Sequence, residues 1–283
     1  MQDDRELSET LFRCPAAQLK HPVAIQPLEP QTQETVLRGT SSAGCTVGGD
    51  AMHTPETVEN VADLDSVQRL RAMYAALLTA YGTRKWWPAD TAFEVILGAY
   101  LTQATAWRSV ERSIANLRHA RRLTVAGIRT IPEEELRELI RPSGFTIRKA
   151  ASIKIFVQFL DEQYDGSLEQ MAKQSTPVLR AELLALPGVG QETADAILLY
   201  ALGHPVFVVD EYLRRVATRH ELVAANARYA ELQSLGDAAV ASATGEETTR
   251  HANELHALIV EVGKRHCGTT PRCEDCPLQL FLP

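Results

Sequence analysis

The sequence contains no run of apolar residues that approaches the roughly 20 needed to cross a bilayer as a helix. Its first residues, MQDDRELSET, are too acidic and too polar for a signal peptide. Strand signals are also almost absent, whereas apolar residues recur at helical spacing along most of the chain. The sequence therefore predicts a soluble intracellular protein of the all-α class, with no membrane partner.

Net positive charge is lacking as well, because the formal net charge of the 283 residues is -7. Residues 1–60 hold nine acidic and four basic residues, so the rest of the chain is nearly neutral. A nearly neutral domain still binds nucleic acid if its bases lie on one face, since local counterion release sets the affinity. The net charge alone therefore does not decide whether the protein binds nucleic acid.

Cysteines are few, and three of the five lie close together near the C-terminus, at Cys267, Cys273 and Cys276. In an intracellular protein such clustering favours a metal site over a disulfide. Cys14 and Cys45 lie in the leader and are expected to be unbridged thiols. Residues 1–60 show no sustained periodicity, which predicts a disordered leader. A regulatory tail and a start at Met52 are both compatible with this composition.

The most informative stretch is LLALPGVGQETADAILLYALGHPVFVVDEYLRRVATR, from Leu183 to Arg219. We expect a helix with Thr176 and Pro177 as its N-cap and first residue, ended by Pro187 and Gly188. Gly188, Val189 and Gly190 then form a tight hairpin, and a second helix begins near Gln191.

Two glycines beside a helix N-terminus leave backbone N–H groups pointing outward, with no Cβ to block the approach of an anion. A phosphate fits such a place, and peptide groups would hold it without regard to base sequence. The pattern is that of a helix-hairpin-helix. A plain αα-hairpin, in which the glycines only make the turn, is the structural alternative.

An extended apolar run, HPVFVVD, follows the second helix and ends at Asp210, the predicted N-cap of the next helix. From about Leu64 onward, LPGVG and Asp210 together resemble the endonuclease III superfamily of DNA glycosylases. This resemblance implies that Asp210 acts in catalysis, whereas the residue taken alone indicates only a helix cap.

One position departs from the best-known members of that superfamily. Its bifunctional enzymes place a lysine two residues after the second hairpin glycine, and that amine forms a Schiff base with the sugar. Here the residue is Glu192, which cannot form an imine, so the resemblance implies a monofunctional enzyme. A glutamate at this position is similar to the 3-methyladenine DNA glycosylase branch. An ordinary acidic residue in a first helical turn is the alternative.

The C-terminal segment departs too, because the family's iron–sulfur loop has four cysteines and the fourth position here is Leu282. Three thiolates fit a 4Fe–4S cluster poorly, since each iron needs a terminal ligand. Four readings stay open: a cluster held incompletely, a cluster completed by His266, a three-cysteine, one-histidine zinc site, and a loop that keeps its shape without metal.

Three further residues are implied in DNA binding by the resemblance. Gln103 matches a glutamine that enters the duplex, and an amide can hydrogen-bond an orphaned base. Arg148 and Lys149 belong to a Gly-aromatic-x-x-x-Lys-Ala element and are candidates for phosphate pairing. The alternatives are a solvent-facing amide and a solvated basic helix face. His251 and His256 are interpreted as surface residues.

The expected architecture is two helical lobes with a cleft between them. Residues 85–205 form a six-helix-type lobe that contains the helix-hairpin-helix and a buried helix over Phe93–Leu101. Residues 61–84 and 206–264 form a second, discontinuous lobe, and residues 265–283 form a cysteine-rich loop. Asp210 would lie at the cleft, a place suited to a flipped base.

The predicted function is that of a monofunctional base-excision repair glycosylase acting on a damaged, alkylated base in double-stranded DNA. A bifunctional glycosylase with lyase activity and a non-catalytic helix-hairpin-helix DNA-binding protein remain alternatives. We expect a monomer in the cytoplasm, associated with the nucleoid if the source is bacterial. The candidates for stacking on the base are Trp86, Trp87, Phe145 or Tyr212.

Overall fold

The computed structural model describes residues 64–84 and 87–283, and within these ranges the secondary structure is helical and contains no strand. The α-helices are α1 (Ser66–Tyr81), α2 (Ala92–Thr102), α3 (Trp107–His119), α4 (Val125–Thr130), α5 (Glu133–Leu139), α6 (Thr146–Tyr164), α7 (Leu168–Met171), α8 (Thr176–Ala185), α9 (Gln191–Ala196), α10 (Glu211–Arg219), α11 (Tyr229–Val240) and α12 (Gly245–Arg265). Shorter turns are η2 (Arg141–Ser143), η3 (Ile197–Ala201, a π-helix) and η4 (Gln279–Phe281). The all-α prediction is confirmed.

The expectations for the leader, Cys14, Cys45 and Trp86 lie outside the described residues. In the part of the chain that is described, no helix combines the length and the apolar character that a membrane crossing requires.

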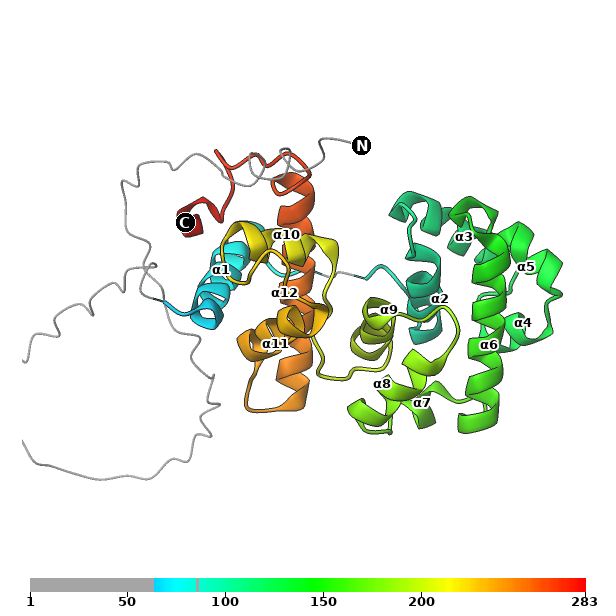
Figure 1. Ribbon diagram of the computed structural model, residues 1–283. Helices are drawn as coiled ribbons and strands as arrows, with labels where there is room; N and C mark the ends of the chain where they lie inside the picture. The colour runs from blue at the N-terminus through cyan, green and yellow to red at the C-terminus, as the bar shows by residue number, and fades with distance from the viewer. Residues whose placement is uncertain (1–63, 85–86) are drawn as a thin grey trace, which may run out of the picture.

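The helices form two lobes, as Figure 1 shows. One lobe packs α1, α10, α11 and α12 against one another, and the other contains α2 to α9. The chain passes from the first lobe to the second between α1 and α2, and it returns after η3. Helices from both ends of the described chain therefore build one lobe. The residue boundaries given above for the two lobes stay a prediction.

Helix α2 is the buried centre of its lobe, because every residue from Phe93 to Leu101 is buried. A helix that is apolar on all sides has no face suited to water, so the sequence pattern predicted this position. Thr91 begins the helix by accepting a hydrogen bond from the N–H of Glu94.

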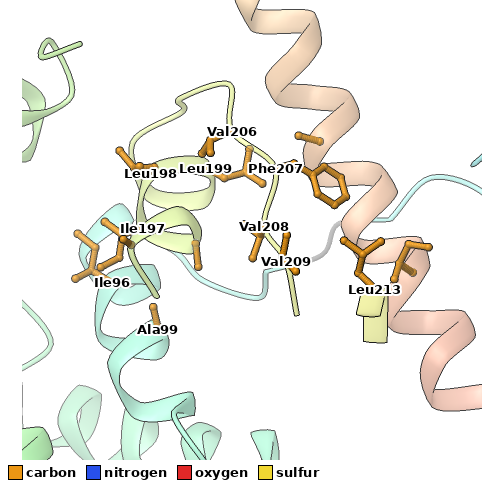
Figure 2. Packing of buried hydrophobic residues seen from close by; sticks show 14 of the residues in the cluster. Ile96, Ala99, Ile197, Leu198, Leu199, Val206, Phe207, Val208, Val209 and Leu213 are labelled. Atoms are coloured by element: carbon orange, nitrogen blue, oxygen red, sulfur yellow. The ribbon is translucent and has the colours of Figure 1, made fainter. Parts of the chain in front are cut away.

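The apolar core continues from α2 across η3 and the extended segment Val206–Val209 to α10 (Figure 2). Phe207 is fully buried in this segment, and it lies against Gly236 of α11, where an added Cβ would come within 2.3 Å of the ring. The extended run is therefore fixed in the core immediately before Asp210, which fixes the direction of that residue.

The local prediction around the hairpin is correct except at one end. Helix α9 begins at Gln191 as expected, but the N-cap of α8 is Ser175, and Thr176 and Pro177 are its first two residues. The hydroxyl of Thr176 lies 2.9 Å from Nδ1 of His204 instead of capping the helix. The helix therefore begins one residue earlier than predicted, and the Thr176 side chain makes a tertiary contact.

Candidate active site

The hairpin of α8 and α9 needs glycine at Gly188 for two reasons. Its φ is +81°, in the left-handed region, and an added Cβ would lie 2.5 Å from Oγ of Ser152. At Gly190 an added Cβ would meet no atom within 4 Å, so this part of the turn is open. Val189 points inward and is buried. The turn therefore presents backbone, not side chains, at the start of α9, whose first N–H groups have no intrahelical partners.

Gln103, the C-cap of α2, is bound to this hairpin. Its Nε2 donates to the carbonyl oxygen of Gly188 (2.9 Å) and to Oγ1 of Thr193 (3.1 Å). The structure thus brings Gln103 and the glycine turn together, and the entry of Gln103 into a duplex stays a prediction. In this structure the amide ties α2 to the turn, and the residue is half-buried.

Lys149 differs from its predicted role, because its side chain is buried in α6. Its Nζ donates to the carbonyl oxygens of Leu101 and Ser143 (both 2.8 Å) and to Oγ1 of Thr105 (2.7 Å). Desolvation and the neighbouring Arg148 lower the pKa of Lys149 to about 8. The interpretation of Lys149 as a phosphate ligand is therefore wrong for this structure: the lysine joins the loop after α2 to the start of α6.

Arg148 is exposed, and its guanidinium lies 5.4 Å from the ring centroid of Phe145. Its role in DNA binding stays a prediction. Phe145 itself is 62% exposed at the start of α6 and does not line the cavity described below, so its expected stacking on a base within that cavity is not supported.

Asp210 is the N-cap of α10, as predicted, and its Oδ1 accepts a hydrogen bond from the N–H of Leu213 (2.7 Å). Its Oδ2 lies 3.6 Å from Nε2 of His256, and the side chain is 12% exposed. One carboxylate oxygen is thus used to begin the helix, while the other faces a histidine on α12.

Asp210 lies in a cavity of about 450 Å³ between the lobes. The lining combines aromatic side chains with a few polar ones: Trp87, Trp107, Tyr200, Tyr212, Gln103, Glu192, Asp210, His256 and Lys264 are among its residues. A second cavity, of about 500 Å³, is lined by Gly188, Gly190, Gln103, Glu192, Asp210 and Arg214. The glycine turn and the carboxylate therefore share one hollow surface, which can hold a nucleotide.

Glu192 lies in the first turn of α9 and lines both cavities. The residue is exposed. Desolvation nevertheless raises the pKa of its carboxyl group, and the charge of Asp210 raises that pKa further. His256 acts in the opposite direction. Two carboxyl groups and an imidazole are thus electrostatically coupled within one site.

Sequence reasoning missed Trp107, Tyr200 and Lys264, which line the cavity, and misjudged His256, which is 5% exposed. The interpretation of His256 as a surface residue is therefore wrong. Its spacing from the apolar Ala252 and Ile259 places it on the inner face of α12, and this was a usable signal. Tyr200 lies in the π-helix η3, and no residue pattern in the sequence predicts such a turn.

Arg219 contacts the start of the C-terminal loop. Its guanidinium donates to Sγ of Cys267 (3.1 Å) and to the carbonyl oxygens of Gly268 (2.8 Å) and Thr269 (2.9 Å). No three His, Cys, Asp or Glu side chains of the described residues are grouped so that they could hold a metal ion. Nδ1 of His266 lies 3.3 Å from the carbonyl oxygen of Arg272.

Cys267, Cys273 and Cys276 line one small cavity together with Leu282, which stands at the fourth ligand position. A 4Fe–4S cluster needs a terminal ligand for each of its four irons. The residues present therefore do not fit such a cluster, whereas the hydrogen bonds of Arg219 hold the loop at Cys267, Gly268 and Thr269.

Comparisons with known proteins agree with this geometry. Residues 97–240 match the model of the HhH-GPD superfamily base excision DNA repair proteins. A Methanocaldococcus jannaschii protein named as a DNA repair glycosylase is 43% identical over 74% of this chain and 93% of its own length.

Solved structures agree as well. The Helicobacter pylori 3-methyladenine DNA glycosylase MagIII, bound to 1,N6-ethenoadenine, is 30% identical, with a TM-score of 0.60 over 71% of this chain and 98% of that one. An endonuclease III–DNA covalent intermediate is 24% identical and shares the fold, with a TM-score of 0.63 over 76% of this chain and 95% of that one.

Proposed function

Because the chain belongs to the HhH-GPD superfamily of base excision DNA repair glycosylases, we propose that it is a monofunctional member that releases an alkylated purine from duplex DNA. The observation that carries this proposal is the composition of the cavity between the lobes. Aromatic walls from Trp87, Trp107 and Tyr212 surround the two carboxyl groups of Glu192 and Asp210. An aromatic and acidic pocket favours a flat base that carries positive charge.

Each part of the site has a role in the proposed reaction. The backbone of the turn at Gly188 and Gly190 binds a phosphate of the strand, and the damaged nucleotide rotates into the cavity. Gln103 exchanges its bond to Gly188 for contacts with the opened duplex. Asp210, as a carboxylate, stabilises the positively charged sugar or positions the attacking water. An alkylated cationic base leaves as a neutral molecule, so no general acid is required.

Two facts favour the monofunctional, 3-methyladenine-like branch. Glu192 stands where the lyase lysine of bifunctional enzymes would be, and a carboxylate cannot form an imine. MagIII, whose name describes a 3-methyladenine DNA glycosylase, is 30% identical over 71% of this chain.

A bifunctional mechanism is the second candidate, because Lys264 of α12 lines the same cavity as Asp210. An amine in that place could attack C1′ of the sugar and lead to strand cleavage.

The test is a panel of duplexes that each carry one lesion: 1,N6-ethenoadenine, 3-methyladenine, thymine glycol, uracil or a mismatch. We expect release of 3-methyladenine, whose base is cationic, together with intact abasic strands and no covalent complex on borohydride treatment. A trapped complex that disappears in Lys264→Met would establish the bifunctional mechanism instead. DNA binding without release of any base would favour a non-catalytic binding protein.

A further inference from the structure

Tyr200, His256 and Asp210 form a continuous chain of polar contacts from three different elements. The phenol oxygen of Tyr200, in η3, lies 2.5 Å from Nδ1 of His256, in α12. Nε2 of the same imidazole lies 3.6 Å from Oδ2 of Asp210, at the start of α10. All three side chains line the cavity between the lobes.

The ring of His256 is held from more than one side. Phe207 packs edge-on against it with ring centroids 6.3 Å apart, and Tyr200 packs against it at 5.8 Å. Tyr200 also lies against Trp87, at 5.1 Å between centroids. The imidazole therefore has little freedom to turn, and its Nε2 stays directed at the carboxylate.

The tautomer of His256 follows from its partner. Burial, with a smaller effect from Asp210, raises the pKa of the Tyr200 phenol well above its ordinary value, so the phenol keeps its proton. A protonated phenol that donates to Nδ1 leaves Nε2 as the ring nitrogen that carries the imidazole proton. That N–H points at the oxygen of Asp210 that the helix cap does not use.

We propose that His256, oriented by Tyr200, is a positioning residue for Asp210, which holds its second carboxylate oxygen towards the sugar of the flipped nucleotide. This proposal rests on the catalytic role given to Asp210 above. The 3.6 Å between Nε2 of His256 and Oδ2 of Asp210 is slightly longer than a hydrogen bond, and such contacts tighten when substrate binds.

The test compares two histidines of the same helix. His256→Leu removes the contact with Asp210, whereas His251→Leu removes a similar bond, between Nδ1 of His251 and the Tyr74 hydroxyl (3.0 Å), away from the cavity. The rate of base release is measured under single turnover, with the best substrate of the duplex panel. Affinity is measured separately on a duplex that carries a tetrahydrofuran abasic analogue.

We expect His256→Leu to slow release about tenfold with unchanged affinity, and Tyr200→Phe to slow it about threefold. His256→Gln, whose amide can donate to Asp210, should recover most of the rate, while His251→Leu should match the wild type.

Equal rates for His256→Leu and wild type, with release abolished in Asp210→Asn, would overturn the positioning role and leave the proposed function intact. So would a loss in His256→Leu that His256→Gln does not reduce, because a purely structural role predicts it. Unchanged release in Asp210→Asn would instead reject the proposed function, and the positioning role with it.

Discussion

Two aspartates only fifteen residues apart, Asp195 on α9 and Asp210 on α10, are placed in opposite ways. Asp195 is fully buried, and both its oxygens are occupied: Arg180 donates to each (2.6 and 3.0 Å), and Tyr229 and Gln233 donate to Oδ2 (2.8 and 2.7 Å). Asp210 has one oxygen in a helix cap and the other at a cavity.

The difference separates a structural carboxylate from a candidate catalytic one. Arg180 lies on α8, whereas Tyr229 and Gln233 lie on α11, so Asp195 joins the helix-hairpin-helix to the other lobe. A fully buried carboxylate with both oxygens bound by protein donors stabilises a structure and cannot reach a substrate. A carboxylate with one oxygen facing a cavity is available for chemistry. The same substitution at both positions should therefore have opposite consequences.

The largest effect is expected from Asp195→Asn, which keeps the shape of the side chain. It leaves the charge of Arg180 uncompensated and places an amide donor among donors, so the free energy of unfolding should fall by about 3–5 kcal/mol. Chemical denaturation measures this loss. The single-turnover rate, taken well below the melting temperature, should change little. A stable variant with a large loss of rate would contradict the structural role.

Asp210→Asn should show the reverse pattern. Asparagine caps a helix about as well as aspartate, so the free energy of unfolding should change by less than about 0.5 kcal/mol. The rate of base release should fall about 10²–10³-fold, because the negative charge near the developing positive charge is lost. Affinity for an abasic-analogue duplex controls for binding. An unchanged rate with an intact fold would remove Asp210 from the mechanism.

The sequence was sufficient for features that depend on local pattern. The glycine turn, the start of α9, the cap at Asp210 and the buried helix α2 all follow from spacing and from residue types with strong local preferences. Asp210 was identified both by its place before a helix and by family resemblance.

The sequence was insufficient where a residue's role depends on tertiary contacts. Lysine usually lies at the surface, so the sequence predicted an exposed Lys149. Gly144 and Phe145, both with positive φ, instead precede a helix whose fourth residue, Lys149, is buried. His256 and Tyr200 meet only after α12 and η3 pack together. Arg180 and Tyr229 likewise reach Asp195 from helices distant in sequence.

Lys149 extends the comparison to a buried positive charge. Lys149→Met leaves acceptors at Leu101, Thr105 and Ser143 without their donor, so the free energy of unfolding should fall by about 2 kcal/mol. The pKa of Lys149 is lowered to about 8, below the ordinary value of about 10.4. Between these values the unfolded chain binds more protons than the folded one, so the contribution of Lys149 to stability rises with pH.

Denaturation of the wild type and Lys149→Met at pH 7, 8.5 and 10 checks both the loss and its sign. The stability difference between the two proteins should widen from pH 7 to pH 10. Since Lys149 contacts the loop that carries Gln103, affinity for duplex DNA should also decrease slightly. A difference that stays constant or narrows with pH would show that the ammonium is not desolvated in the fold.

The smallest effect is expected from Glu192→Gln. This substitution tests whether the charge of Glu192 in the cavity lowers the free energy of unfolding. Desolvation and the charge of Asp210 raise the pKa of Glu192. Just above the ordinary pKa of glutamate, the folded protein therefore binds more protons than the unfolded chain. The free energy of unfolding consequently falls as the pH rises through that range. At pH 7 the ionised carboxylate is therefore a cost, which glutamine removes. Because the residue is exposed, water screens the effect, and the gain should be below about 1 kcal/mol. Denaturation at pH 7 and pH 4 should show the gain in stability only at pH 7. The release of a cationic base should become slower. A variant less stable than the wild type at pH 7 would show that Glu192, like Asp195, is a structural carboxylate.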